Sequence, residues 1–474
     1  MQKNRRVYRL SPSQLSAETI AVTFAKTSRS PKAFDEIASE LDAEKSSKFS
    51  EKWIVGYGHA SVAEHAVLHL ALENVSRLAI ETIEGNRLAS YTEKSTRYQE
   101  WDPDAYVVPP EIIASPHEQL YRSTLADLFS FYARAIAPLR HWAEQSTPRL
   151  EGESEKAWEN RARTQAIDVC RFILPAASMA NVGVTMNART LEYAIKKMLS
   201  SELAEVRTIG EEVKFVATQE LPTLVKYANP MPYLAGIKSA FANQPLPVSD
   251  AHSDWCQLLE VDPQGEQKVL AALLYRFGHG THQACLQQAQ TLNLQQKQSL
   301  VAALFKDAGA FDVPLRELEF TSYTFDMVLD QGAYFEFKRH RMMTQTPQPL
   351  TTRLGFAMPK MFVEASLDQE FIHIMRQTAL AYEQLATWNA EVASYIVPNA
   401  FNRRILFSLN LRELFHFSRI RCNANAHFSI RRVGRGMLEK ITPHHPLFTQ
   451  HLCVDCAETS ASITENYFAG VAIN

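Results

Sequence analysis

The sequence of 474 residues has few cysteines, no long apolar run and no surplus of one charge. Its six cysteines are sparse for this length, which fits a reducing cytoplasm. No stretch of about 18 apolar residues occurs, and the basic N-terminus lacks the apolar core of a secretory signal, so we expect neither a membrane span nor export. A net charge of −3 without a charge run gives no reason to expect a nucleic acid or an anionic membrane as partner.

Apolar and charged residues occur in the proportions of a folded protein. Hydrophobic residues make up 46% of the chain and charged residues 21%, which is typical of a soluble globular protein. A chain of 474 residues is longer than one ordinary core requires, so we expect at least two domains. Small anionic ligands stay compatible with this composition, because a few well-placed arginines suffice to bind them.

Several short landmarks occur twice at almost the same spacing. The Gly-His dipeptide at 58–59 returns at 278–279, which is 220 residues later. An apolar-proline step followed by Asn-x-Arg spans Pro175–Asn187 and returns 223 residues later at Pro398–Asn410. Several landmarks at nearly one offset indicate a tandem duplication.

The segment 229–254 separates the two copies. It is rich in proline, alanine, asparagine and serine and lacks helical periodicity, as expected for a connection. We therefore predict a first module over 1–235 and a second module over 236–474.

Hydrophobic periodicity predicts a helix-rich α+β fold. Apolar residues recur at three- and four-residue steps in 117–145 and 371–397, which is typical of amphipathic helices. The best strand candidates are 321–330 and 333–340, which are rich in aromatic and β-branched residues.

Arg339, His340 and Arg341 lie at the end of the second strand candidate, after its apolar and aromatic residues. Arginine binds phosphates and carbonyl oxygens through fixed pairs of donors, and a histidine ring can stack or donate a hydrogen bond. This composition suits an anionic, aromatic ligand. A solvated basic turn explains the same residues without any ligand.

A second polar segment runs from Glu93 to Glu100. In extended backbone, Glu93, Ser95 and Arg97 share one face, where a carboxylate, a hydroxyl and a guanidinium can hold a sugar phosphate and a polar base. The alternative is an exposed strand edge with salt bridges.

His59, Ser61, Glu64 and His65 crowd the start of a predicted helix. Ser61 and Glu64 have the spacing of a capping box, which explains both residues without any function but leaves His59 unexplained. The two histidines have no obvious third ligand, so we predict no metal at this segment.

Two further clusters lie near the end of the chain. The arginines are Arg419, Arg421, Arg431 and Arg432. A solvated helix face explains them as well as a ligand site does. Cys453 and Cys456 form a Cys-x-x-Cys pair after three histidines, where a zinc or redox site is conceivable, although free cysteines are commonly just small buried residues.

These features, in this order, resemble the flavin-dependent thymidylate synthases. Proteins of that family carry a Gly-His-x-Ser-x-x-Glu-His segment and an Arg-His-Arg-x-x-Ser-x-Asn-Glu-x-Ser-x-Arg-Tyr signature. An arginine four residues before a proline, an Asn-x-Arg step and a late arginine follow. Each half of this chain spans nearly a whole family module, so the resemblance covers most of the sequence.

The resemblance implies two tandem modules of the thymidylate-synthase-complementing type, each helix-rich with a mixed or antiparallel sheet. The family forms a homotetramer with flavin and nucleotide sites between subunits. Two fused modules would imitate a pair of subunits, and a homodimer of this chain would imitate the tetramer.

The two copies depart from the family pattern in complementary ways. The first half loses the leading Arg-His of the signature but keeps its end, with Glu93, Ser95 and Arg97, and keeps Arg171 before the proline. The second half keeps Arg-His-Arg, but prolines replace polar residues of the signature and cannot present the same side chains. We therefore expect composite sites, with a nucleotide-facing first module and a flavin-facing second module.

The resemblance also implies the residues of the site. The flavin would be held by His59, Ser61, Arg339, His340, Arg341, Asn410, Arg412 and His416. The nucleotide would be held by Glu93, Ser95, Arg97, Arg171 and Arg421. Two arginines would act in catalysis: Arg421 would stabilise negative charge on the pyrimidine, and Arg339 is the second.

The implied reaction is reductive methylation of dUMP at C5 with FAD, with methylenetetrahydrofolate as carbon donor and NADPH as reductant of the flavin. One residue points to a different substrate. Glu336 stands where the family has glutamine, and a carboxylate near an anionic ligand is unfavourable unless it is protonated or paired, for instance with Lys338. The alternatives are methylation or hydroxymethylation of another uridine nucleotide, or a flavin- or nucleotide-binding protein without turnover.

Overall fold

The chain folds into two compact units, and neither unit is one continuous half of the sequence. A computed structural model describes residue 6 and residues 8–28, 30–52, 60–242, 254–309, 311–452, 454 and 457–473. Unit 1 comprises Met1–Lys94, Ala105–Glu118 and Ala177–Pro247, and unit 2 comprises Ser95–Asp104, Gln119–Ala176 and Val248–Asn474. The predicted module boundary at residue 235 stays a prediction, because these units divide the chain by contact and not by ancestry.

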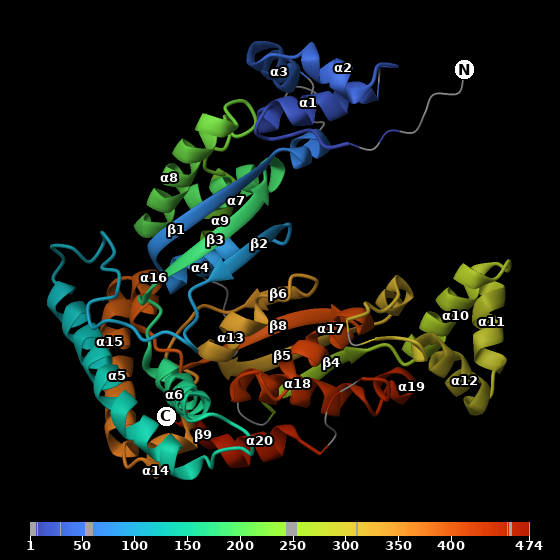
Figure 1. The fold of residues 1–474 in the computed structure, drawn as a ribbon. Helices are drawn as coiled ribbons and strands as arrows, with labels where there is room; N and C mark the ends of the chain where they lie inside the picture. The colour runs from blue at the N-terminus through green and yellow to red at the C-terminus, as the bar shows by residue number, and fades with distance from the viewer. Residues whose placement is uncertain are drawn as a thin grey trace. The chain divides into compact units, whose positions relative to one another are not determined.

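Unit 1 is built on a three-stranded antiparallel sheet with the strand order β1-β3-β2. The strands are β1 (Val67–Ser76), β2 (Ala89–Glu93) and β3 (Met179–Asn187). Alternate residues of β3 are buried, and the helices α4 (Arg77–Glu84), α7 (Ala188–Leu199) and α8 (Ala204–Glu220) pack against the sheet (Figure 1). The remaining elements of unit 1 are α1 (Ala17–Thr27), α2 (Phe34–Ser39), α3 (Ala43–Phe49), η2 (Ala60–His65) and α9 (Pro232–Ala242).

Unit 2 contains a four-stranded antiparallel sheet with the strand order β4-β5-β8-β6. Its strands are β4 (Cys256–Val261), β5 (Ser322–Asp330), β6 (Thr344–Pro347) and β8 (Asn402–Asn410). Helices α13 (Gln331–Phe337), α17 (Leu411–Arg421) and α18 (Phe428–Ile441) pack together beside this sheet. Phe325, Phe337 and Phe407 interlock in the core between them, with ring centroids 5.3 Å and 4.7 Å apart.

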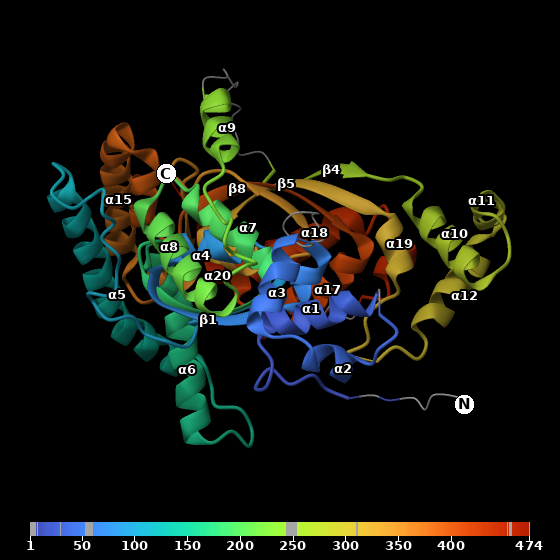
Figure 2. The same ribbon diagram turned by 90° about the horizontal axis from the view of Figure 1, so that it is seen from above.

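Two helical groups complete unit 2. The long helices α5 (Glu118–Ser146) and α15 (Asp368–Trp388) lie side by side in both ribbon views (Figures 1 and 2), joined by an Arg134–Glu370 ion pair. A second group consists of α10 (Gly265–Phe277), α11 (His282–Thr291) and α12 (Leu294–Phe305). The remaining elements are α6 (Glu155–Cys170), η3 (Arg171–Ile173), η4 (Arg316–Phe320), β7 (Phe356–Pro359), α14 (Lys360–Glu364), α16 (Ala390–Ala393), η5 (Ser394–Ile396), α19 (Pro446–Thr449), α20 (Ser460–Tyr467) and β9 (Phe468–Ile473).

The two sheets share one topology. The succession β1-α4-β2 in unit 1 matches β5-α13-β6 in unit 2, and in each sheet a later strand, β3 or β8, lies between the first two. Each middle strand ends in an asparagine whose side chain caps the next helix, Asn187 for α7 and Asn410 for α17. Matching order, pairing and caps support the tandem duplication predicted from the sequence.

The equivalent proline steps of the two copies contact each other within unit 2. Pro175 and Pro398 form an antiparallel bridge. The N–H of Ala176 donates to the Val397 carbonyl, and the N–H of Asn399 donates to the Leu174 carbonyl, both at 3.0 Å. Such reciprocal bonds between equivalent positions are the pattern of an isologous contact between two copies of one surface.

Some of the predicted elements are confirmed and one is wrong. The strand over 321–330 is β5 and the helix over 117–145 is α5. The helix over 371–397 stops at Trp388, because the Asn389 side chain caps the separate helix α16. No described helix combines the length and apolar character that a membrane crossing requires.

The strand predicted over 333–340 is wrong, because most of it lies in α13. The Asp330 carboxylate accepts a hydrogen bond from the Ala333 N–H at 2.8 Å and caps this helix. Every residue of α13 is buried. Periodicity cannot distinguish a strand from a helix that has no polar face.

Candidate functional site

A buried chain of ion pairs in unit 2 joins residues from both halves of the sequence. The Glu336 carboxylate accepts hydrogen bonds from Arg171 Nη1 and from Arg421 Nη1, each at 2.9 Å and each on its own oxygen. Arg421 Nη2 also donates to the Glu336 backbone carbonyl at 3.2 Å. The side chains of Arg171 and Arg421 are 3% and 15% exposed. One carboxylate therefore pairs with two of the three arginines that the family resemblance assigns to the nucleotide.

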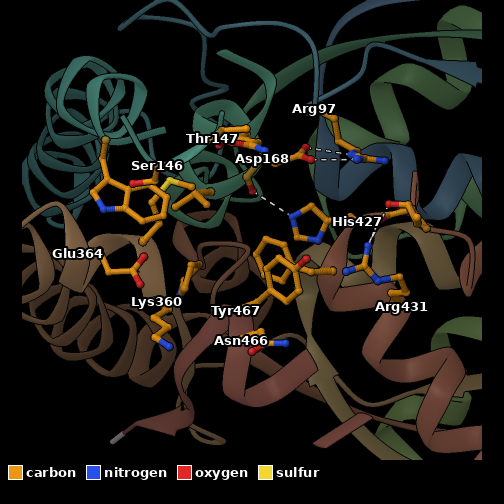
Figure 3. Close-up of a pocket in the computed structure, with 18 residues that line it drawn as sticks. Arg97, Ser146, Thr147, Asp168, Lys360, Glu364, His427, Arg431, Asn466 and Tyr467 are labelled. Atoms are coloured by element: carbon orange, nitrogen blue, oxygen red, sulfur yellow. Dashed lines mark hydrogen bonds and ion pairs between the residues drawn. The ribbon is translucent and has the colours of Figure 1, made fainter. Parts of the chain in front are cut away.

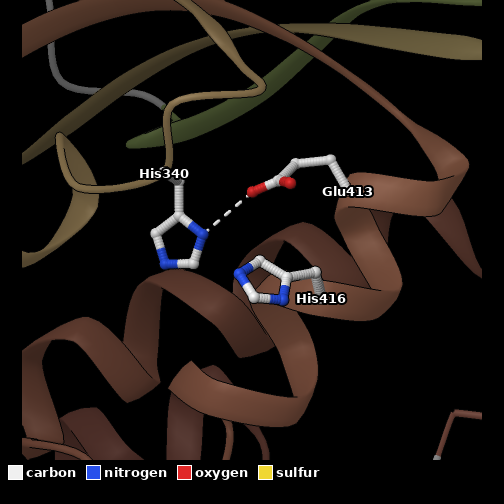
Figure 4. Close-up of side chains that lie close together, drawn as sticks. All are labelled: His340, Glu413 and His416. Carbon is white, nitrogen blue, oxygen red and sulfur yellow. Dashed lines mark hydrogen bonds and ion pairs between the residues drawn. The ribbon is translucent and has the colours of Figure 1, made fainter. Parts of the chain in front are cut away.

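The buried row of side-chain contacts continues from Arg421 through His340 to Glu413. Arg421 Nε–H donates to His340 Nε2 at 3.0 Å, so that ring nitrogen is an acceptor. A neutral His340 ring then carries its proton on Nδ1, which lies 2.9 Å from Glu413 Oε1 (Figure 4). Both side chains are buried. The neighbours thus select one tautomer of His340.

Helix ends place these side chains. The Asn410 side chain accepts a hydrogen bond from the Glu413 N–H at 2.8 Å and starts α17, so Glu413 lies in the first turn and Arg421 is the last residue. Glu336 lies in the last turn of α13. Arg171 is the first residue of η3, directly after α6.

The electrostatic balance keeps Glu336 ionised. Burial raises the pKa of Glu336, but Arg171, Arg421 and Arg97 together outweigh burial and hold this pKa below its ordinary value. Burial and the Arg421 charge hold the pKa of His340 well below its usual range, so the ring is neutral at pH 7. Burial raises the pKa of Glu413 to about 7. The buried row of ion pairs and hydrogen bonds therefore gains or loses a proton near neutral pH at Glu413.

Replacing Glu413 with glutamine should change how stability depends on pH. A raised pKa means that the proton on Glu413 stabilises the folded state fully below the unfolded pKa, about 4.3, and that this stability is lost as pH rises through about 7. The amide does not titrate but still accepts the His340 Nδ1–H. We expect Glu413→Gln to be more stable relative to wild type at pH 8 than at pH 5, by on the order of 1–3 kcal/mol.

Thermal unfolding at pH 5, 6, 7 and 8 measures this difference. The exposed Glu383 pairs with Arg353 at the surface, so Glu383→Gln is the matched control and should track wild type. The contribution of His340 to stability decreases as the pH falls below the pKa of histidine in the unfolded chain. This contribution is present in both proteins, so it cancels from their difference. A pH-independent difference between Glu413→Gln and wild type contradicts the assigned titration.

His340, Glu413 and His416 also place ligand atoms within 4.8 Å of one another (Figure 4). Two histidines and a carboxylate are a common metal-ligand set. If His340 Nδ1 bound a metal, however, Nε2 would carry the proton and face the Arg421 Nε–H 3.0 Å away, so two donors would meet. Arg421 and Arg412 add further positive charge. The hydrogen bonds therefore favour a protonated Nδ1 on His340 over a metal bound at that atom.

The residues expected to face a flavin are in different environments. Arg339, Arg341 and His416 are exposed, whereas His340 is buried. Arg412 donates to the Pro314 carbonyl at 2.8 Å and to Glu319 at 2.9 Å. Arg412 and the capping residue Asn410 therefore have structural roles in unit 2.

The Gly-His-x-Ser segment is only partly described. His59 lies outside the described residues, as do Cys453 and Cys456. Ser61 is exposed inside the short 3-10 helix η2, and the Glu64 carboxylate pairs with Arg189 at 2.5 Å. The expected capping box is wrong, because Ser61 does not precede the helix and Glu64 has another partner.

Glu93 is buried in unit 1, where its carboxylate lies 3.1 Å from Arg77 Nη1. The strand β2 ends at Glu93, and Ser95 and Arg97 belong to a turn in which the Arg97 N–H donates to Ser95 Oγ at 3.2 Å. The extended face expected for these three residues is wrong, because the turn ends the alternation. Arg97 instead donates hydrogen bonds from Nε and Nη2 to the two carboxylate oxygens of Asp168, each at 2.9 Å.

Two of the four arginines of the late cluster are buried. Arg431 and Arg432 are each 6% exposed on α18, and Arg432 lies over the Trp255 ring at 3.7 Å. A solvated helix face is therefore wrong for these two residues. Arg419 donates to the Asp312 carbonyl at 3.0 Å.

Asp168 and Glu413 belong to the site although no sequence motif pointed to them. Asp168 lies three residues before Arg171, and Glu413 lies three residues after Asn410 and three before His416. On a helix this spacing puts side chains on one face. That periodicity was the available signal for both carboxylates.

Comparison with known proteins agrees with this architecture. The family model described as "Thymidylate synthase complementing protein" matches residues 10–223 and again residues 257–447. A UPF0159 protein from Chlamydia muridarum is 28% identical over 446 residues, covering 89% of this chain and 83% of its own length. A UPF0159 protein from Thermoplasma acidophilum is 25% identical over 447 residues, covering 86% of this chain and 88% of its own length.

A single-module relative matches about half of the chain. A flavin-dependent thymidylate synthase from Clostridium tetani is 30% identical over 214 residues, which is 45% of this chain and 82% of that protein. The match of this relative to about half of the chain and the double match of the family model both fit a module that is present twice. The chain belongs to the thymidylate synthase complementing protein family and carries the family module twice in tandem.

Proposed function

We propose that this protein is a flavin-dependent enzyme that methylates C5 of a uridine nucleotide, with dUMP as the first candidate. Methylenetetrahydrofolate would supply the carbon and NADPH would reduce the flavin. FAD, when bound, supplies the hydride, and the protein binds and orients the reactants. The family membership and the flavin-dependent relatives support this assignment.

The observation that carries the proposal is the convergence of Arg171 and Arg421 on one carboxylate. Arg171 comes from the first half of the sequence and Arg421 from the second. The guanidinium groups of both residues donate hydrogen bonds to the Glu336 carboxylate. Arg171 Nε and Nη2 are buried without a hydrogen-bond partner in the described part of the chain. These two N–H groups form the fork that arginine uses for phosphate. A nucleotide that displaced the Glu336 carboxylate would find two arginines already aligned.

The residues present fit a flavin in part. The exposed Arg339, Arg341 and His416 surround the buried His340, and cationic side chains suit the flavin's phosphates. Asn410 and Arg412 are held by contacts within unit 2 and fit this role poorly. We therefore assign flavin binding to Arg339, His340, Arg341 and His416.

The remaining residues of the composite site have unequal support. Arg97 is oriented by Asp168 and would position the nucleotide from the first half. Arg421 and Arg339 would be the catalytic arginines, with Arg421 opposite the pyrimidine. Two modules would provide one site, and a homodimer would complete the family's four-module arrangement.

The test is an absorbance spectrum of the purified protein followed by turnover assays. A flavin spectrum that is lost in Arg339→Ala, and NADPH oxidation coupled to a one-methyl mass gain on dUMP, are the expected results. UMP and dCMP should be assayed in parallel, because they report a sister activity. Protein that holds flavin but modifies no pyrimidine nucleotide would instead be a binding protein. The hydrogen bonds that Arg421 already donates to His340 and Glu336 favour this alternative.

A further inference from the structure

Unit 2 contains a cavity of about 340 Å³ that the buried ion-pair chain does not line (Figure 3). Its walls come from both halves of the sequence, from Trp142 and Asp168 on one side to Lys360, Glu364 and Tyr467 on the other. Arg171, Glu336 and Arg421 are not among its lining residues. Of the residues assigned to the uridine nucleotide, Arg97 lines this cavity, whereas Arg171 and Arg421 do not.

Several charged groups that line the cavity already have partners. Arg97 is held by Asp168, and His427 Nε2–H donates to the Asp168 carbonyl at 3.0 Å. Arg431 Nη1 donates to the Ala424 carbonyl at 3.0 Å and Arg431 Nε lies 3.1 Å from Glu458. These side chains shape the cavity and hold one another in place.

Other polar groups on the walls have no such partners. The Trp142 indole N–H, the Glu364 carboxylate and the Asn466 amide make no hydrogen bond or ion pair to any residue that the structure describes. Lys360 Nζ has a single 3.4 Å contact with the Glu465 carbonyl, which leaves its other donors for a ligand. Figure 3 shows Lys360 and Glu364 on one wall and Asn466 beside Tyr467. Polar groups that converge from three helices on a concave surface are the mark of a ligand site.

Aromatic side chains supply flat surfaces in the same cavity. Tyr467 stacks on Phe428 with a centroid distance of 5.1 Å and an interplanar angle of 6°. Both rings line the cavity, together with Trp142. Stacked aromatic rings of this kind hold planar ligands, which gain from ring contact in addition to buried area.

We propose that this cavity is a second ligand site, which binds a mononucleotide with an amino-substituted base. The Glu364 carboxylate accepts hydrogen bonds from the base amino group and an adjacent ring N–H, and Lys360 attracts the phosphate. A volume of about 340 Å³ lies at the lower end of ligand pockets, so it suits one nucleotide and excludes a dinucleotide. Guanine presents two neighbouring donors to a carboxylate, so GMP is the best match.

The proposal can be tested by calorimetric titration of the full chain with GMP, AMP, CMP, UMP and inorganic phosphate. We expect GMP to bind most tightly, UMP, which lacks an amino group, weakly, and phosphate alone weakest. Glu364→Gln should weaken GMP binding about tenfold or more, because a charged acceptor becomes neutral. Lys360→Met should weaken GMP but not guanosine.

Matched controls lie on α6 of the same unit. Glu159→Gln and Lys156→Met change exposed side chains outside the cavity and should bind GMP as wild type does. Excess dUMP should not displace GMP, and Glu336→Gln should leave its affinity unchanged, which separates this site from the proposed substrate site. No GMP binding at millimolar concentration, or binding insensitive to both Glu364→Gln and Lys360→Met, overturns the proposal.

Discussion

Replacing Arg421 with methionine should lower the free energy of unfolding by about 3–5 kcal/mol, the range seen when one partner of a buried ion pair is removed. The methionine keeps much of the volume and removes the charge. It leaves the Glu336 carboxylate with one arginine instead of two and leaves His340 Nε2 without its donor. Both buried groups then carry a desolvation cost that no partner offsets. Chemical denaturation at pH 7 measures the loss.

Arg419, two residues earlier on α17, provides the matched control. It donates to the Asp312 carbonyl from a more exposed position, so Arg419→Met should cost much less, within about 1 kcal/mol. Equal losses for the two variants would mean that the Glu336–Arg421–His340 contacts contribute little to folding, which contradicts their assigned role.

Replacing Glu336 with glutamine should strengthen dUMP binding by about tenfold to a hundredfold, because a charged competitor for Arg171 and Arg421 becomes a neutral one. The same change should destabilise the ligand-free protein, since two buried guanidinium groups lose their counter-ion. Added dUMP should then restore stability in proportion to its binding. Titration calorimetry and thermal unfolding with and without dUMP measure both effects.

Glu383→Gln, a surface change with the same chemistry, should alter neither quantity. If Glu336→Gln binds dUMP no more tightly than wild type, the two arginines do not bind a nucleotide phosphate or carbonyl. The ion-pair chain is then purely structural. If the variant loses stability that no uridine nucleotide restores, the same conclusion follows.

The fold could be predicted from the sequence wherever an element has one polar face. The helix over 117–145 and the strand over 321–330 are confirmed, and the repeated landmarks correspond to a shared strand order. Helix α13 could not be predicted, because every one of its side chains is buried and its start depends on the Asp330 cap. The division into compact units was also out of reach, since it depends on contacts between residues far apart in the sequence.

The candidate site was predictable as a set of residues but not as a set of contacts. Arg171, His340 and Arg421 follow from the family motifs, and the structure brings them together around Glu336. The sequence suggested Lys338 as partner of Glu336, but two arginines hold that carboxylate instead. Spacing along the chain identifies side chains that share a helix face, whereas an ion pair between helices depends on tertiary packing.

Unit 2 combines segments that are far apart in the sequence, so residues that pack together are synthesised at different times. Helix α5 buries Phe131 against Phe362 and Phe371, which are translated only after all of unit 1. At roughly 5–20 residues per second, the nascent chain carries this apolar helix without its partners for on the order of 10 s or more. A chaperone has that interval in which to cover the helix. A gene cut at the module boundary would yield two aggregation-prone fragments, because each would lack partners that the other encodes.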